Sequence, residues 1–352
     1  MDKFEIETER PRIPWAIGRS VCCVVMSTAY VNMVLCEISD PTEVLVTILA
    51  GSASILALYG PNSRVKLLIS SLVSGLLLFI PNGLFRAGCA GAVAGYSQTV
   101  SEIYTARLSL KAFRADAVSF LNFVSTMQAC VIFFLLAFTS FGDYAKSFGL
   151  AVVTIAVQAF LILYWVPIPP IEIIKRNLQG NSLIYGDVYT MLTDLFKGAP
   201  FPSFHSEYSE IVDLSNGKTL PIQSKAWAVA QKVNVSFLTT AILGVLSSDT
   251  SNSSYLVLFS CTTMFSWMHA HRSPTQHVEM CTLTVAVMLL FIVLLYEVPP
   301  MLVIIMACSV YFVPSEEGFL ALTSWAIAIA NIFRSLFGAA VFYFLLRNRI
   351  SF

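Results

Sequence analysis

The chain has 352 residues, of which 57% are hydrophobic and 12% are charged, and its formal net charge is zero. Roughly a quarter of the residues in a soluble domain are charged, so this composition excludes an ordinary soluble fold and indicates a protein surrounded by lipid. The lack of net positive charge argues against nucleic acid as a partner.

Apolar runs follow one another along the chain, apart from one long polar stretch over residues 171–226. Six runs precede this stretch and five follow it, and most approach the roughly 20 residues that a membrane-spanning helix needs. The expected spans are 14–36, 43–60, 66–85, 87–104, 117–141, 147–169, 227–247, 254–269, 278–296, 298–313 and 319–346. The predicted fold is therefore an all-α polytopic membrane protein of about eleven transmembrane helices in a 6+5 arrangement. It has a six-helix membrane half (1–170), a large loop between helices six and seven (171–226) and a five-helix membrane half (227–352).

The fourth span, 87–104, is the least hydrophobic of the eleven and is rich in glycine and alanine. Its small residues share one helix face, which would let a neighbouring helix approach closely: Gly88, Gly91 and Gly95. The same span contains Gln98 and Glu102. These features predict a helix packed in the interior of the bundle.

Basic residues are distributed unevenly between alternate loops. With the N-terminus in the cytoplasm, the inner segments hold fourteen lysines and arginines and the outer segments hold four, as the positive-inside rule requires. We therefore predict a cytoplasmic N-terminus, a cytoplasmic loop over 171–226 and an outside C-terminus. Asn252 begins an Asn-Ser-Ser sequon in a predicted outer loop, which makes it a candidate glycosylation site.

The large loop carries two kinds of signal. Apolar residues recur at helical spacing between residues 183 and 196, which predicts a short amphipathic helix lying on the membrane or packed within its own loop. Tyr189 and Tyr208 are each followed three places on by an apolar residue, Leu192 and Ile211. Such tetrapeptides bind clathrin adaptors as extended strands. Tyr208 is the better candidate sorting motif, because Tyr189 falls in the predicted helix and can serve for packing.

Polar side chains within the spans are costly in lipid and point to function or to contacts between helices. Arg334 and Asn331 lie near the middle of the last span. They either orient that helix against its neighbours or line a cavity for a polar ligand. Four charged residues lie within about two turns of the inner boundary, where they can reach headgroups or pair: Arg19, Glu102, Lys232 and Glu279.

No catalytic or metal-binding motif is recognisable in the sequence. The eight cysteines fall in or at the ends of apolar runs, without metal-ligand spacing. His269, His271 and His277 lack the further ligands that a zinc site needs. Phosphate-binding glycine loops and nucleophile elbows are also missing. We therefore expect no enzyme activity and no cofactor.

Five short segments carry a resemblance to a known family: 36–43 (CEISDPTE), 59–66 (YGPNSRVK), 101–104 (SEIY), 255–261 (YLVLFSC) and 281–284 (CTLT). They resemble the multi-span envelope proteins of gammaherpesviruses, of which the Epstein–Barr virus member is the best known. The resemblance implies a protein of the virion envelope and of host plasma or endosomal membranes. Such a protein associates with a single-span type II viral glycoprotein, helps it reach the cell surface and promotes spread between cells.

One departure from that family concerns integrins. The Epstein–Barr virus member is associated with integrin attachment through an Arg-Gly-Asp sequence, and this chain has none. Integrin binding is therefore not implied here.

The order of spans is also similar to that of equilibrative nucleoside transporters, which have eleven spans and a large loop between spans six and seven. The aspartate–arginine pair that those transporters carry in the eighth span has no counterpart in residues 254–268. This alternative implies a transporter-like protein that moves or binds a small polar solute, although likeness of fold does not assign transport.

Overall fold

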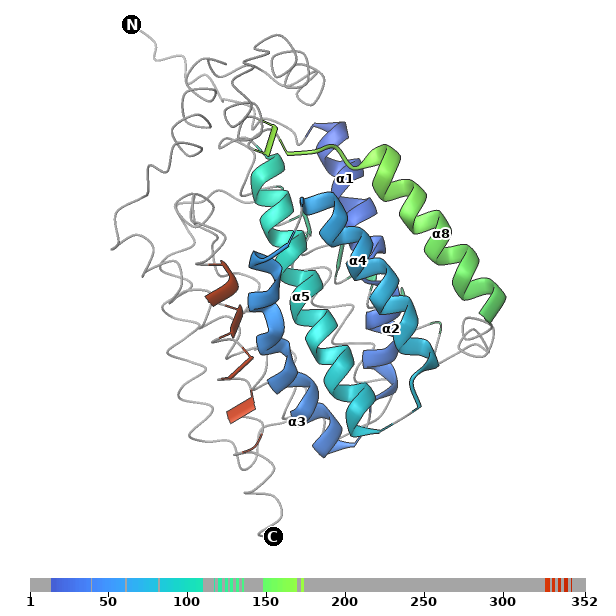
Figure 1. Ribbon diagram of the computed structural model, residues 1–352, viewed down its shortest axis with the longest axis vertical. Helices are drawn as coiled ribbons and strands as arrows, with labels where there is room; N and C mark the ends of the chain where they lie inside the picture. Colours follow the sequence, from blue (N-terminus) through green and yellow to red (C-terminus); the bar gives the residue numbers. More distant parts are fainter. Residues whose placement is uncertain are drawn as a thin grey trace, which may run out of the picture.

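The computed structural model describes residues 14–109 except 39, 61 and 82, residues 148–169 and 172–173, and helical residues scattered between 117 and 135 and between 327 and 343. All the regular elements in these ranges are helical, and they form a bundle with α5 in its middle (Figure 1). The elements are α1 (Trp15–Met26), α2 (Ala29–Glu37), α3 (Pro41–Ala50), the 3-10 helix η1 (Gly51–Leu58), α4 (Ser63–Leu76), the 3-10 helix η2 (Leu77–Phe79), α5 (Leu84–Leu108) and α8 (Phe148–Trp165).

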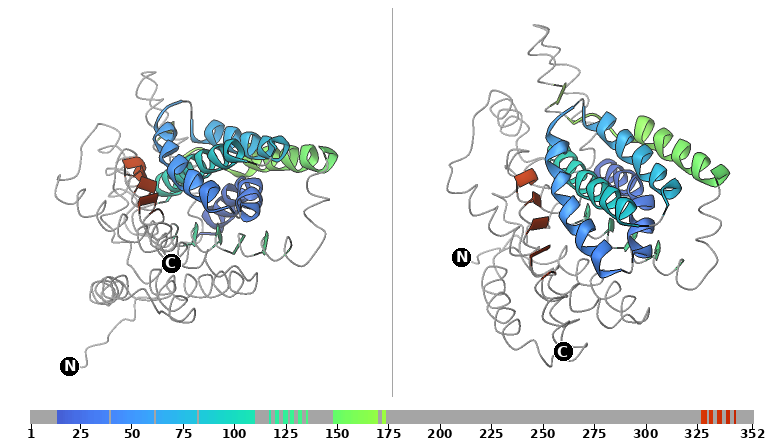
Figure 2. Two further views of the ribbon diagram at one scale, coloured as in Figure 1. Left: turned by 90° about the horizontal axis from the view of Figure 1, so that it is seen from below. Right: turned by 60° about the horizontal axis from the view of Figure 1, so that its bottom comes forward.

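The order of these helices across the bundle can be followed in all three views. α5 lies between α3 and α4, while α8 lies beside α4 at the edge of the bundle (Figures 1 and 2). The helical residues between 327 and 343 lie on the other side, next to α3 and η1, where the Ser54 hydroxyl donates to the carbonyl oxygen of Ala328 at 3.4 Å.

The expected single span over 14–36 is two helices. α1 and α2 meet at Ser27 and Thr28, where the axis bends by 44°. The hydroxyls of these two residues donate to the carbonyl oxygens of Val24 and Val25, at 2.6 and 2.8 Å. Hydroxyl side chains that bond to the preceding turn often bend a helix, so the bend has a local cause.

α3 begins at a capped turn. The Asp40 carboxylate accepts hydrogen bonds from the backbone N–H of Thr42 at 2.8 Å and from the Thr42 hydroxyl at 2.7 Å. These bonds hold the pKa of the exposed Asp40 carboxyl below its usual range. Pro41 occupies the first turn, where a missing N–H removes no helical hydrogen bond. The expected span 43–60 corresponds to α3 followed by η1, and the chain then turns at Gly60, whose φ is 94°.

α5 has 25 residues and extends beyond the expected span 87–104 at both ends. It starts after Gly83, whose φ of 137° suits glycine. The expected span 66–85 is divided between α4, η2 and the start of α5. Arg86, expected in an outer loop, therefore lies inside α5. It is buried there, and its guanidinium donates to the Glu37 carboxylate at 3.0 Å, which ties the start of α5 to the end of α2.

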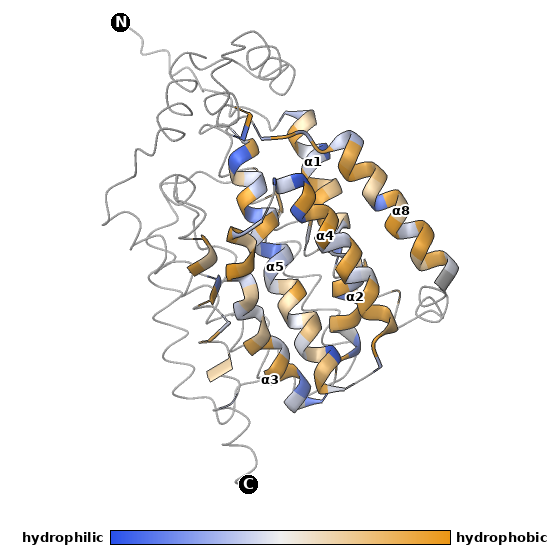
Figure 3. Ribbon diagram, in the orientation of Figure 1, coloured by the Kyte–Doolittle hydropathy of each residue, from blue (hydrophilic) through white to orange (hydrophobic). Residues whose placement is uncertain are grey.

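α8 corresponds closely to the expected span 147–169. Its outward side chains are apolar and exposed, among them Val153, Val157, Phe160 and Leu163. Figure 3 shows α8 as hydrophobic along most of its length, while α5 is paler and contains more hydrophilic residues. In a membrane, such an outward apolar face is in contact with lipid.

By length and hydropathy, the described residues include no single helix that could cross a membrane, whereas α1 and α2 pass that test as a bent pair. Apart from residues 172 and 173, the loop 171–226 lies outside the described residues, and so does most of the half 227–352. The number of spans and the domain boundaries therefore stay predictions.

Candidate functional site

The glycines of α5 bring its backbone against α3 and η1. A Cβ atom on Gly91 would collide with the carbonyl group of Thr47, and a Cβ atom on Gly95 would collide with that of Gly51. Gly88 has more room, because its Cβ would meet only a side-chain methyl group at 3.5 Å. This contact between backbones fixes the position of α5.

One turn further along α5, polar side chains meet the C-terminal helical residues. The Asn331 Nδ2 donates to the Thr99 hydroxyl at 2.7 Å and lies 3.4 Å from Glu102 Oε2. The Gln98 Nε2 donates to the other carboxylate oxygen, Glu102 Oε1, at 3.1 Å. Glu102 is 8% exposed and Asn331 is 4% exposed. We call these four residues the Asn331 cluster.

The amide of Asn331 has one chemically sensible orientation in this cluster. The Thr99 hydroxyl already donates to the carbonyl oxygen of Gly95 at 2.8 Å, and an ionised Glu102 only accepts hydrogen bonds. Both neighbours therefore need the donor that Asn331 Nδ2 supplies. Asn331 Oδ1 is left buried, with no hydrogen-bond partner in the part of the chain that the structure describes. A buried acceptor in this condition costs free energy, and it offers a bonding position to a ligand that carries a donor.

The structure brings together two of the polar residues singled out in the sequence. Asn331 and Glu102 lie on different helices and face each other, so Glu102 contacts the protein interior rather than the headgroups. Of the other four, Arg19 lies on α1, while Arg334, Lys232 and Glu279 lie outside the described residues and stay predictions.

Two glutamines that the sequence did not single out bond to the bend between α1 and α2. The Gln128 Nε2 donates to the carbonyl oxygen of Val25 at 3.1 Å, and the Gln158 Nε2 donates to that of Met26 at 2.9 Å. The Gln158 Oε1 accepts from the Ser71 hydroxyl at 2.5 Å. The only signal in the sequence is an amide inside an apolar run, which must find partners when buried.

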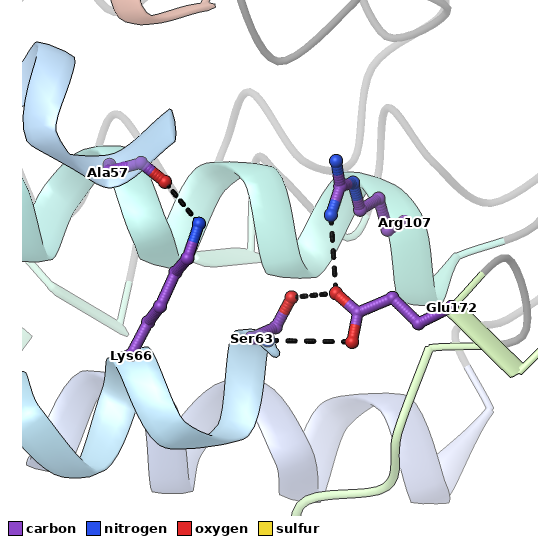
Figure 4. A network of polar contacts seen from close by, with 5 residues as sticks. All are labelled: Ala57, Ser63, Lys66, Arg107 and Glu172. Carbon is purple, nitrogen blue, oxygen red and sulfur yellow. Dashed lines mark hydrogen bonds and ion pairs between the residues drawn. The ribbon is translucent and has the colours of Figure 1, made fainter. Parts of the chain in front are cut away.

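A second polar network lies where α4 begins and α5 ends (Figure 4). Glu172 Oε1 accepts from the Ser63 hydroxyl and from the Arg107 guanidinium at 3.2 Å, and Glu172 Oε2 lies 3.4 Å from the Ser63 backbone nitrogen. The Lys66 ammonium donates to the carbonyl oxygen of Ala57 at 2.5 Å. A carboxylate is favourable at a helix N-terminus, so Glu172 attaches the chain that follows α8 to both α4 and α5.

The sorting and glycosylation candidates lie outside the described residues: Tyr189, Leu192, Tyr208, Ile211 and Asn252. Within the described ranges, His, Cys, Asp and Glu side chains form no group of three or more that could hold a metal ion.

No protein-family model matches the sequence, and no curated protein matches it. Solved structures do match. The proton:xylose symporter XylE of the major facilitator superfamily (MFS), bound to 6-bromo-6-deoxy-D-glucose, matches with a TM-score of 0.61 and 13% identity, over 96% of this chain and 89% of that chain. The partially occluded, inward-open xylose transporter XylE from E. coli matches with a TM-score of 0.50 and 13% identity, over 93% of this chain and 90% of that chain.

Similarity at this level of identity concerns the fold and leaves the activity open. It agrees with the composition and with the helical bundle. The chain is a helical, polytopic membrane protein with the fold of MFS transporters.

Proposed function

We propose that the chain is a transporter-like membrane protein that binds a small polar solute and moves it across the membrane. The Asn331 cluster carries this proposal, because it gathers a carboxylate, two amides and a hydroxyl in the interior, between residues 229 positions apart. Transporter folds place their solute sites between helices, and this cluster lies between α5 and the helical residues near the C-terminus. The structural neighbour XylE is a proton:xylose symporter. By analogy with xylose, we expect the solute of this chain to carry several hydroxyl groups.

The chemistry of the cluster narrows the solute class. Asn331 Oδ1 and the Glu102 carboxylate both accept hydrogen bonds, so the preferred solute carries hydroxyl or amine donors. The cluster acts by binding, and we propose no catalytic step.

Uptake into reconstituted vesicles tests this proposal. We expect at least one solute from a radiolabelled panel of pentoses, hexoses and nucleosides to enter faster than into empty vesicles. Asn331→Ala removes a hydrogen bond to the solute and Glu102→Gln replaces a charged acceptor by a weaker, neutral one, so each should lower that uptake at least about tenfold. Thr154→Val removes an exposed hydroxyl on α8 and should leave uptake unchanged. Uptake equal to that of empty vesicles across the whole panel would remove the proposal.

The sequence resemblance favours a second function. We propose, as the alternative, a non-enzymatic viral envelope and host-membrane protein that scaffolds and traffics a type II viral glycoprotein and promotes cell-to-cell spread. Segments 36–43 and 59–66, which carry the resemblance, include the capped start of α3 and the turn before α4. In this proposal the N-terminus is cytoplasmic, and the Tyr208 motif recruits clathrin adaptors at the plasma or endosomal membrane.

Affinity purification of the tagged chain from productively infected cells, in mild detergent, tests the second function. A type II viral glycoprotein recovered in near-equal amount supports it, and Tyr208→Ala should then lower surface delivery of both proteins. Tyr189→Ala, in the predicted helix, is the matched control. Recovery of the chain without any viral glycoprotein counts against the scaffold.

A further inference from the structure

Arg19 lies at one end of the bundle and has a hydrogen-bond donor without a matching acceptor among the described residues. It lies on the second turn of α1, and its Nε is buried with no hydrogen-bond partner among the described residues. The ion pairs found within the described ranges join Arg86 to Glu37 and Arg107 to Glu172. A guanidinium carries five N–H donors, and leaving a desolvated donor unmatched costs free energy. An acceptor from outside the protein would remove this cost.

The neighbours of Arg19 are aromatic. Its Cζ lies 5.5 Å from the centre of the Trp165 ring, at the end of α8. Trp15, one turn before Arg19 on α1, is exposed, as are Tyr164 and Trp165. Tryptophan and tyrosine concentrate where a membrane meets water. The aromatic residues therefore indicate that Arg19 lies at the level of the lipid headgroups.

The charges at the two ends of the bundle differ in sign. α1 and α4 begin, and α5 and α8 end, at the upper end in Figure 1. Among the described residues, the charges nearest this end are Arg19, Arg64, Lys66, Arg107 and Glu172, with Glu102 further inside on α5, and those of the opposite end are Glu37, Asp40, Glu43 and Arg86. Clustered basic residues attract anionic lipids, so the surroundings of Arg19 favour a negatively charged headgroup.

We propose that Arg19 and Trp165 bind the phosphate of an anionic phospholipid headgroup. The guanidinium donates two parallel N–H groups to phosphate oxygens, an arrangement that lysine cannot reproduce. The Trp165 ring holds the cation in place through its π face and contacts the upper part of the acyl chain. The site is separate from the Asn331 cluster and does not depend on either proposed function.

Lipid retention by the purified full-length chain tests the site. The protein is passed through gel filtration in micelles with equal amounts of phosphatidylglycerol and phosphatidylcholine, and the retained lipid is measured by mass spectrometry. We expect phosphatidylglycerol to be enriched on the wild-type chain, and Arg19→Gln to lower that enrichment about tenfold, because charge-assisted hydrogen bonds are lost. Lys66→Gln removes one charge from the same end, where the Lys66 ammonium already donates to Ala57. It should lower the enrichment by less than about fivefold.

The proposal is overturned if the phosphatidylglycerol enrichment on Arg19→Gln stays within twofold of wild type. It is equally overturned if Lys66→Gln lowers the enrichment as much as Arg19→Gln does. It is also overturned if inorganic phosphate displaces the lipid, since the site would then be one for soluble anions. Should Arg19→Gln fail to fold, Arg19→Lys and Trp165→Leu decide the question. Both should lower the enrichment severalfold, and wild-type retention by both would refute the site.

Discussion

α5 and α8 lie in the same bundle but differ in what surrounds them. α5 is rich in glycine, serine and threonine and has buried residues on several sides. α8 is composed mostly of large apolar residues, and much of its surface is exposed. In a soluble protein the more hydrophobic helix would be the interior one. In lipid the order is reversed, because small and polar groups need protein neighbours whereas large apolar side chains are satisfied by acyl chains.

The sharpest test of this comparison is a single methyl group added to each helix. Gly91→Ala in α5 places a Cβ against the carbonyl group of Thr47. Because that atom is backbone and cannot rotate away, we expect a loss of about 3 kcal/mol or more in the free energy of unfolding. Gly149→Ala in α8 meets nothing within 4 Å and should stabilise the helix by about 0.5 kcal/mol.

Reversible unfolding in mixed detergent micelles, followed by far-UV circular dichroism, measures both changes. Gly88→Ala is a control on the same face of α5, where the new methyl group has room, and it should cost little. Equal stability of Gly91→Ala and Gly149→Ala would show that the two backbones do not touch.

Gln158 is a buried polar residue in the otherwise largely apolar helix α8. Its amide lies on the inward face and bonds to the carbonyl oxygen of Met26 and to the Ser71 hydroxyl. Gln158→Leu keeps the size of the side chain but leaves both groups without this partner, so we expect a loss of about 2 kcal/mol. The same unfolding measurement checks it.

The loss of stability expected for Gln158→Leu should be absent at Thr154, one turn earlier on α8. Within the described residues Thr154 bonds to the Leu150 carbonyl oxygen of its own helix and is partly exposed, so Thr154→Val should change stability by less than about 0.5 kcal/mol. If the two variants behave alike, the bonds of the inward amide of Gln158 contribute nothing measurable to stability.

The sequence predicted α5 and α8 more successfully than it predicted the bend. Apolar length locates α8, and the glycine spacing with Gln98 and Glu102 indicates an interior helix, which is where the structure places α5. Ser27 and Thr28 are common in unbroken helices, and the glutamine that bonds to Val25 lies 103 residues away. Local sequence cannot reveal such a partner.

The candidate site was also predicted only in part: the sequence indicates its residues but not their contact. Glu102 and Asn331 each stand out as a polar residue within an apolar run, so they could be named from the sequence. That they face each other depends on how the C-terminal helical residues pack against η1 and α5. The pairing is a tertiary property, and periodicity within a span carries no information about it.

The smallest expected change in stability comes from replacing a valine by alanine in each of the two helices. Val100 in α5 is buried, while Val153 in α8 faces outward. In a membrane, truncation loses packing rather than transfer from water, because the unfolded chain also stays in lipid. Val100→Ala should therefore cost about 1 kcal/mol through the cavity that it leaves, and Val153→Ala should cost less than about 0.5 kcal/mol. A larger loss at Val153, seen in the same unfolding titration, would mean that protein rather than lipid covers the outer face of α8.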